Sequence, residues 1–463
     1  MDDRLQQLAK QHLMLHFTDM HSLVEEGTTI IDRGEGCHVF DTEGRRYIDG
    51  LSGLYCVNVG HSYGEEIAAA ASAQMARLPF TTNWTVAHPP AIELAAKLAE
   101  LAPEGLERVF FTSGGAESVE SAWKMAVQFH QANGEPARRK VIARHDAYHG
   151  VTMGALAMTG LEECRTPFEP FGITAVHVSN TNAYRHPEGA DPARMRGALL
   201  AEVEETIERE GAETIAMLIA EPVQNAGGCL VPPEGYWAGL REICDRHGIL
   251  LVSDEVICAF GRIGTFFGGQ RLDYKPDMIT FAKGLTGAHF PMGGLLISER
   301  VAAPFIEGKE MYLHGITFGG HPVGAAVASA TIEIYERENV MDNVMANEPV
   351  AHDALNALRD IPIVGDVRGI GHFWAIELVR DQESRETFEG PAAEWLLKDV
   401  LSAELWGRGL ICRLDDRTDP IVQIAPPLVA DAGTIEEIAQ ILREGLTVAA
   451  ERMSERPELS ATA

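Results

Sequence analysis

The sequence is short of basic residues, of paired cysteines and of long apolar runs, and each shortage excludes a class of protein. It has 38 lysines and arginines against 68 aspartates and glutamates, which gives a formal net charge of −30. A surface of this sign repels nucleic acid and anionic membranes. No apolar run is long enough to span a bilayer. We therefore expect neither nucleic acid nor a membrane as a partner.

The seven cysteines are scattered, odd in number and without a CxxC pair. This pattern favours neither a disulfide framework nor a zinc site, so no metal site is predicted. The first residues lack the apolar core of a secretory signal. The expectation is a cytoplasmic protein with reduced thiols.

At 463 residues the chain is long enough for two domains with sizeable cores. In its middle, short apolar segments alternate with helix-like segments, such as the one at 199–209. This alternation predicts an α/β fold with a mainly parallel seven-stranded sheet sandwiched by helices. Ligands then belong at the carboxyl ends of the strands. Strands are expected at 108–112, 140–144, 175–178, 215–220, 249–253, 277–282 and 293–297.

The pattern changes after a helix expected at 322–337. The tail contains strand-like segments between 367 and 424 and two expected helices, 392–408 and 434–453. It reads as a smaller α+β domain that the N-terminal residues join. The predicted division is residues 1–65 as the N-terminal segment of the small domain, 66–325 as the large domain and 326–463 as the C-terminal part of the small domain.

Lys283 closes the buried strand expected at 277–282. Lysine is seldom buried without a partner or a task. Burial lowers its pKa, and a neutral ε-amine is the form that makes an imine with a carbonyl cofactor. The alternative is a lysine that simply emerges into solvent where the strand ends. A second buried strand ends at Asp254, 29 residues earlier, and this arrangement favours chemistry.

Two further strands end in polar or glycine-rich turns. One runs through Gly114 and Gly115 into a helix, whose free N–H groups form an anion site; a tight turn explains the glycines equally well. Another is followed by Tyr148 and His149. Tyr148 is placed to stack on a flat ring and His149 to hydrogen-bond it, with a packing role for the aromatic as the alternative.

Glu221 and Gln224 follow a third strand, and Asp254 follows a fourth. A carboxylate there can hold a ring nitrogen protonated, although a lone acid is more often a helix cap or part of an ion pair. An anion turn, a stacking aromatic, a carboxylate and a lysine at one edge of a sheet together fit pyridoxal 5′-phosphate (PLP). The chain has neither a Walker loop nor a GxGxxG fingerprint, which disfavours ATP and NAD.

Six segments, in matching order and spacing, resemble the class III aminotransferases of PLP fold type I. They are FTSGGAES at 111–118, YHG at 148–150, EPVQ at 221–224, DEV at 254–256, FAKG at 281–284 and HGITFGGHP at 314–322. The resemblance covers nearly the whole chain. It implies that Lys283 forms the internal aldimine and acts as general base, with Asp254 on the pyridinium. It further implies phosphate contacts from Gly114, Gly115 and Ala116, ring contacts from Tyr148 and Val256, and a phosphate contact from Thr317 of the neighbouring subunit of a homodimer.

Within this class the chain is most similar to the ω-amino acid or amine:pyruvate group, whose SGLWCVNVG stretch resembles residues 53–58. Ala226 stands where members that prefer 2-oxoglutarate carry a glutamate, which favours a monocarboxylate acceptor such as pyruvate. Arg413 aligns with a flexible arginine that grips the substrate carboxylate, a task that suits a guanidinium; Arg417 competes for this assignment.

The chain also departs from the family pattern. Tyr55 replaces a common tryptophan, Ala116 a common serine and Asn225 a usual glycine. Tyr55, Phe17 and Trp84 are expected to shape the substrate pocket, with packing at the domain interface as the alternative for Tyr55 and Trp84.

The predicted function is the transfer of an amino group from an ω-amino acid or primary amine to pyruvate or another 2-oxo acid, by way of pyridoxamine phosphate. The alternatives are a racemase or epimerase, an aminomutase, a decarboxylase, a 2-oxoglutarate-using aminotransferase, or a non-catalytic relative of this fold. The donor stays open among taurine, β-alanine, diamines and aryl-alkyl amines. A homodimer with shared active sites is expected, with a tetramer as the alternative.

Overall fold

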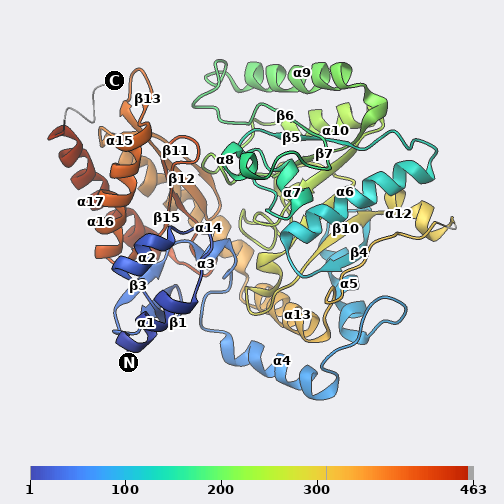
Figure 1. Ribbon diagram of the computed structural model, residues 1–463, viewed down its shortest axis with the longest axis horizontal. Coiled ribbons are helices and arrows are strands. Elements are labelled where there is room, and N and C mark those ends of the chain that lie inside the picture. The colour runs from blue at the N-terminus through green and yellow to red at the C-terminus, as the bar shows by residue number, and fades with distance from the viewer. Residues whose placement is uncertain (1, 309, 457–463) are drawn as a thin grey trace.

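The computed structural model describes residues 2–308 and 310–456 (Figure 1). Its central sheet has seven strands in the order β4-β10-β9-β8-β7-β5-β6. The pairs are parallel except those of β10, which runs antiparallel to β4 and β9. The prediction of a mainly parallel seven-stranded sheet is confirmed. The strands are β4 (Leu106–Thr112), β5 (Lys140–Arg144), β6 (Ala175–Val178), β7 (Ile215–Ala220), β8 (Leu250–Asp254), β9 (Met278–Phe281) and β10 (Gly293–Ser298).

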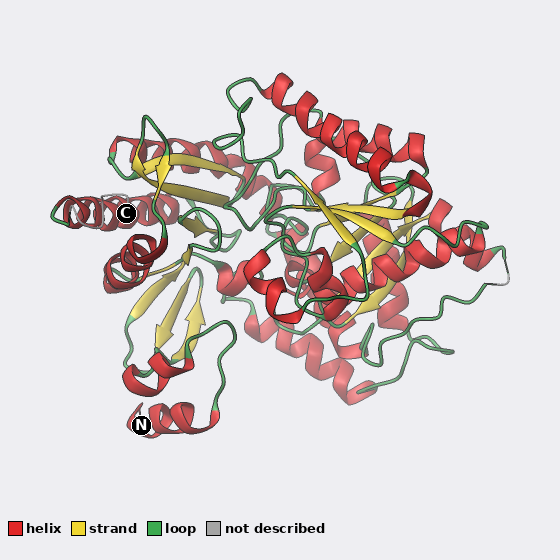
Figure 2. Cartoon of the chain, turned by 45° about the horizontal axis from the view of Figure 1, so that its top comes forward, coloured by secondary structure: helices red, strands yellow, loops and turns green. Residues whose placement is uncertain are grey.

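Both faces of this sheet are covered by helices, as Figures 1 and 2 show. Successive strand side chains point to opposite faces, so neighbouring residues enter different cores. Val141 packs in a core with Val119 of α6 (Gly115–Ala132). Ile142 packs in another with Leu199 of α9 (Pro192–Glu210) and with α10 (Tyr236–His247). Because both faces are buried, these strands read as continuous apolar runs.

The remaining helices of the large domain lie in its connections and along its edge. Helix α9 begins at Pro192, seven residues before the expected start, because Asp191 caps it by accepting bonds from Ala193 N and Arg194 N at 3.0 and 3.2 Å. The others are α4 (Gly64–Arg77), α5 (Pro89–Leu101), α7 (Met153–Met158), α8 (Glu162–Arg165), α11 (Gly268–Leu272), α12 (Glu299–Ile306), α13 (Pro322–Arg337) and the short turns η1 (Thr166–Phe168), η2 (Ala212–Thr214) and η3 (Lys283–Thr286).

The N-terminal and C-terminal segments of the chain lie next to each other at the left of Figure 1. The N-terminal hairpin strands are extended by β14 of the C-terminal segment, which pairs parallel to β3. A second small sheet has the order β11-β12-β16-β15, with β13 on β12. The domain bounds stay a prediction, and α13 runs across residue 325. The strands are β1 (Ile31–Glu35), β2 (His38–Asp41), β3 (Arg46–Asp49), β11 (Val364–Ile370), β12 (Phe373–Asp381), β13 (Glu386–Thr387), β14 (Leu410–Ile411), β15 (Arg413–Asp415) and β16 (Ile421–Ile424).

The tail holds one helix that was not expected, α14 (Val340–Asn356). It starts after Asn339, whose backbone is in the left-handed conformation, and it contains Pro349. A proline inside a helical pattern predicts a break, so the sequence does not indicate this helix. Its Val344 and Leu355 enter different cores, so this helix joins the large and small parts. The other terminal helices are α1 (Asp2–His12), α2 (Met20–Glu26), α3 (Ser52–Tyr55), η4 (Ala357–Asp360), α15 (Gly390–Glu394), the π-helical η5 (Trp395–Leu401), α16 (Ser402–Gly407) and α17 (Ala432–Ser454). No described helix has both the length and the apolarity needed to cross a bilayer.

Arg262 is a fully buried arginine that fastens three parts of the chain. Its guanidinium donates to the carbonyl oxygens of His372 and Pro426 at 3.0 and 2.6 Å. It also donates to Ser52 Oγ and Asn58 Oδ1, both at 3.0 Å. Within the described residues no carboxylate forms an ion pair with it, and burial lowers the pKa of Arg262 to about 10. Uncharged oxygens from the N-terminal and C-terminal segments therefore solvate the guanidinium in place of a carboxylate.

Glu255 is a buried acid whose ionisation should oppose folding. Burial raises the pKa of Glu255 to about 7, against hydrogen bonds from Gly268 N, Ser253 and Tyr274. Because the folded state keeps its proton to higher pH than the unfolded state, stability should fall as the pH rises from about 4.5 to 7. Glu255→Gln should remove about 3 kcal/mol of this loss. Denaturant unfolding of both proteins at pH 5 and pH 8 measures it; parallel pH profiles would contradict the prediction.

Candidate active site

Asp254 ends strand β8 as a buried carboxylate with three hydrogen bonds. His149 Nδ1 lies 2.6 Å from Oδ2, and Thr280 Oγ1 and the Val256 N–H donate to Oδ1 at 2.9 and 3.2 Å. The other ring nitrogen of His149, Nε2, is buried without a hydrogen-bond partner among the described residues. The carboxylate is thus fixed by β8, β9 and the loop after β5, and the histidine beside it has an unsatisfied polar atom.

Lys283 follows strand β9 and has a backbone φ of +40°, a conformation that costs energy in a non-glycine residue. Its side chain is half-buried, and within the described residues its ε-amino group makes no hydrogen bond or ion pair. Burial lowers the pKa of Lys283, although the charge of Asp254 acts in the opposite direction. Within the described residues this amine is therefore unpaired, and its burial favours the neutral, nucleophilic form.

The turn before helix α6 has the form of an anion site. Its N-cap residue, Gly114, gives no side-chain cap, so N–H groups of the first turn stay free. A Cβ at Gly115 would lie 2.8 Å from Cγ1 of Val256, which only glycine avoids. A Cβ at Gly150 would lie 2.6 Å from that of Ala116, so the turn also touches the loop of His149. At Gly114 a Cβ would meet nothing within 4 Å, which leaves open space beside the free N–H groups.

Glu221 ties the loop of Tyr148 to the end of strand β7. Its Oε1 accepts from the Tyr148 N–H at 3.3 Å, and its Oε2 from the Asn225 N–H at 3.0 Å. Burial raises the pKa of the Glu221 carboxyl. Tyr148 itself is half-buried, and burial raises the pKa of its hydroxyl. Four strand ends of one sheet therefore meet through direct contacts, as the sequence predicts for an α/β ligand site.

A buried polar wall continues from this point into the C-terminal sheet. Tyr55, 1% exposed, donates to Gln423 Oε1 at 3.0 Å, and Gln423 Nε2 donates to the Asn225 carbonyl at 2.7 Å. Ala226, also 1% exposed, follows in the same loop. Arg413 lies opposite Gln423 in the β15–β16 pair.

Arg413 and Arg417 differ in their surroundings. Both arginines contact Asp415: Arg417 directs two nitrogens at its two oxygens, whereas Nε of Arg413 donates to Oδ2 alone. Arg413 also lies opposite Gln423, whose side chain donates to the Asn225 carbonyl in the loop of Ala226. This strand pairing therefore places Arg413 beside the loop that follows strand β7.

Three predicted site residues lie on the surface. Phe17 and Trp84 are 73% and 65% exposed, and Thr317 is exposed as well. Trp84 and Thr317 belong to neighbouring loops, since a Cβ at Gly315 would lie 3.2 Å from the Trp84 ring. An apolar groove of about 790 Å³ runs along these loops. Its lining includes Trp84, Ile92, Phe110, Met311, Leu313 and Ile316.

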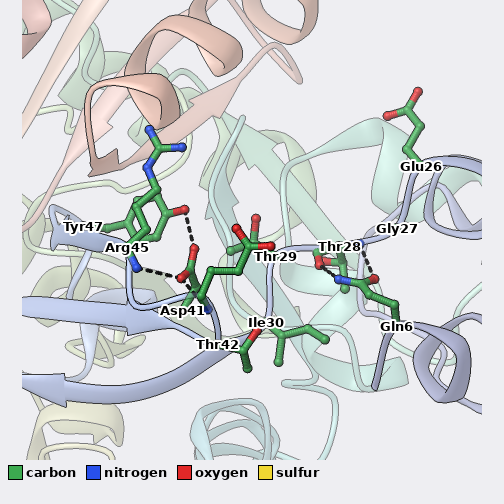
Figure 3. A pocket seen from close by; sticks show the side chains of 11 residues that line it. Gln6, Glu26, Gly27, Thr28, Thr29, Ile30, Asp41, Thr42, Arg45 and Tyr47 are labelled. Atoms are coloured by element: carbon green, nitrogen blue, oxygen red, sulfur yellow. Dashed lines mark hydrogen bonds between the residues drawn. The ribbon is translucent and has the colours of Figure 1, made fainter. Parts of the chain in front are cut away.

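A separate polar hollow of about 400 Å³ lies in the N-terminal part, between helix α1 and the β2–β3 turn (Figure 3). Its side chains pair with their surroundings. Gln6 exchanges two hydrogen bonds with the backbone of Thr28, and Asp41 accepts from the N–H of Arg45 and the hydroxyl of Tyr47. It contains none of the predicted site residues, and these contacts give it a structural role.

Three residues that shape the site were missed in the sequence. Thr280 is a single polar residue in an apolar strand, Gln423 is another, and Asp415 lies between two arginines. A polar residue inside a strand expected to be buried on both faces was the available signal, since such a group needs a partner.

The fold and this site together define a PLP-dependent enzyme of fold type I. The family model "Aminotransferase class-III" matches residues 22–446, so the chain belongs to the class III aminotransferases. A probable aminotransferase of Mycobacterium tuberculosis is 49% identical over 94% of this chain and 93% of its own length. The putrescine–pyruvate aminotransferase of Pseudomonas aeruginosa is 38% identical over 95% of each chain. The solved (S)-enantioselective ω-transaminase of Thermomicrobium roseum is 40% identical, with a TM-score of 0.93 over 97% of this chain and 99% of its own.

Members of this family use PLP, and the site fits that cofactor. It offers an unpaired lysine for the aldehyde and an uncapped helix start, of an 18-residue helix, for the phosphate. It also offers the buried Asp254–His149 pair for a heteroaromatic ring, with an open polar atom on the histidine. The chain is therefore a PLP-dependent aminotransferase that acts on small amines and oxo acids.

Proposed function

We propose that this aminotransferase moves an amino group from an ω-amino acid or a primary amine to pyruvate. The observation that carries the proposal is the place of Arg413 opposite Gln423, which is hydrogen-bonded to Asn225 in the loop that presents the buried Ala226. One guanidinium grips one carboxylate, which matches a monocarboxylate acceptor. The named activities of the Pseudomonas and Thermomicrobium relatives support the same reading.

PLP, when bound, supplies an electron sink that makes the substrate C–H bond beside the nitrogen acidic. In our proposal each part of the cofactor has its holder in this chain. Lys283 would hold the aldehyde and Asp254 the ring nitrogen. Gly114, Gly115 and Ala116 would hold the phosphate, and Tyr148 and Val256 would contact the ring, while His149 and Glu221 fix the surrounding loops.

The residues of the chain then have distinct tasks. Lys283 moves the proton at the substrate carbon, a task that requires the neutral amine which burial favours. His149 and Thr280 orient Asp254 so that its charge stays in one place. Arg413 orients the substrate through its carboxylate, and Tyr55 with Gln423 forms the wall behind it.

We infer further that two copies share their active sites. The apolar loops that carry Trp84 and Thr317 are exposed, as are Met311 at 70%, Leu313 at 74% and Phe318 at 60%. A contiguous apolar surface of this kind marks an interaction site. In a homodimer Thr317 would bind the phosphate of the partner's cofactor, and Trp84 and Phe17 would line the partner's substrate pocket.

A donor panel tests the proposed reaction. The purified holoenzyme is given taurine, β-alanine, putrescine or 1-phenylethylamine, each with pyruvate or with 2-oxoglutarate. With an accepted donor, we expect one alanine formed per pyruvate consumed, and little glutamate from 2-oxoglutarate. Glutamate as the main product would contradict the proposed acceptor. Racemisation of a chiral donor without alanine formation would indicate a racemase. Release of CO₂ from the donor without alanine formation would indicate a decarboxylase.

A further inference from the structure

Asp415 is shared by two arginines at the carboxylate end of the site. Its side chain is 7% exposed, and those of Arg413 and Arg417 are 22% and 15% exposed. Oδ2 accepts from Nε of Arg413 at 3.0 Å and from Nη2 of Arg417 at 2.6 Å, and Nη2 of Arg413 lies 2.9 Å from it as an ion-pair contact. Oδ1 accepts from the Nε and backbone N–H of Arg417 at 2.8 and 3.2 Å.

The two arginines are held unequally. Arg417 reaches both oxygens of Asp415, as in a bidentate pair, whereas Arg413 reaches only Oδ2. Oδ2 is also crowded, because three arginine nitrogens lie within 3.0 Å of it. The three side chains carry a net charge of +1. Asp415 therefore balances Arg413 only in part, and Arg417 draws the negative charge of Asp415 away from it.

A substrate carboxylate competes for the same edge of Arg413. The Nε–Nη2 edge can hold two carboxylate oxygens side by side, but Asp415 gives it one. A substrate carboxylate can therefore present two oxygens to Arg413, whereas Asp415 presents one. A substrate without one leaves the Arg413–Asp415 contact in place, and the half-buried guanidinium keeps a counterion.

We propose that Asp415 and Arg417 are positioning residues that set how firmly Arg413 is held, and so decide the preference of the site for substrates with or without a carboxylate. This inference rests on the role of Arg413 in the proposed function. It assigns Arg417 a task other than gripping the substrate: it neutralises Asp415.

The test compares L-alanine with isopropylamine, which has a methyl group where alanine has the carboxylate. The amine-to-cofactor half-reaction of the holoenzyme is followed by absorbance, and kcat/KM is measured for each amine. Asp415→Asn removes the competitor, so the alanine-to-isopropylamine ratio should rise about tenfold, mainly through KM. Arg417→Gln leaves Asp415 free to hold Arg413 with both oxygens, so the ratio should fall about tenfold. Asp415→Glu keeps a carboxylate at this position, so its alanine-to-isopropylamine ratio should stay close to that of the wild type.

The opposite signs separate this role from a structural one. If both variants lose activity equally on both amines, or shift the ratio in the same direction, the proposal is overturned. Asp360→Asn is the matched control, because Asp360 pairs with Arg443 at 2.9 Å on the surface of the same domain, and its ratio should stay unchanged.

Binding of propanoate distinguishes this inference from the proposed function. Calorimetry on the holoenzyme should show tighter binding in Asp415→Asn and weaker binding in Arg417→Gln, whichever oxo acid is the acceptor. An enzyme that rejects pyruvate but shows these shifts refutes the proposed acceptor and keeps the inference. An enzyme that uses pyruvate but binds propanoate equally in all variants refutes the inference alone.

Discussion

Lys283→Ala should lose the absorbance band of the lysine-bound cofactor and turn over at least about 10⁴-fold more slowly. Alanine has no amine to hold the aldehyde of PLP and none to carry the proton at the substrate carbon. Absorbance spectra and steady-state alanine formation measure the two losses.

The control for this variant is Lys275→Ala. Lys275 lies just before strand β9, and its side chain is 63% exposed and pairs with Glu104 at 2.8 Å. The spectrum and rate of this control should match those of the wild type. A Lys283→Ala protein that keeps both the band and the turnover would falsify the assignment of the catalytic lysine.

Asp254→Asn should lower turnover by about 10³-fold, with the protein still folded. Asparagine keeps the size of the side chain and can keep the bond from Thr280, but it has no charge with which to hold a ring nitrogen protonated. It would also present an amide to His149 at the position where Oδ2 now lies 2.6 Å from Nδ1. Single-turnover absorbance measurements with a saturating amine report this loss directly.

A second buried carboxylate of the same sheet provides the matched control. Asp277 lies at the start of β9, pairs with Arg241 at 2.8 Å and has no contact with the predicted site. Asp277→Asn should lower the melting temperature and leave the single-turnover rate unchanged. If the two variants slow the reaction equally, the effect belongs to the loss of a buried charge and not to Asp254.

The residues at the strand ends were predictable because the carboxyl ends of parallel strands all lie at the same edge of a sheet. Lys283, Asp254, Glu221 and Tyr148 each follow an apolar run, and the carboxyl ends of such runs meet at one edge. The contact of His149 with Asp254 and the hydrogen bond from the Tyr148 N–H to Glu221 confirm that the ends of β5, β7 and β8 meet. The functional assignment of each residue stays a prediction.

Other features could not be derived from one chain read in order. Helix α14 was missed because Pro349 interrupts its pattern, whereas its packing against two cores overrides that local preference. Arg413 and Asp415 lie two residues apart on one face of β15, but the return of Arg417 to Asp415 depends on the turn after this strand, which the spacing does not determine. In the proposed homodimer, Phe17, Trp84 and Thr317 would act on the site of a second copy, which no pattern within one chain describes.

The solitary cation at Arg262 links the stability of distant segments. Removing either the first 60 or so residues or the C-terminal sheet would take away two of the four oxygens that accept hydrogen bonds from this guanidinium. Truncation at either end should therefore destabilise the rest of the protein by more than the lost apolar contacts alone. For protein engineering, the consequence is that the N-terminal segment and the C-terminal sheet should be kept or exchanged together.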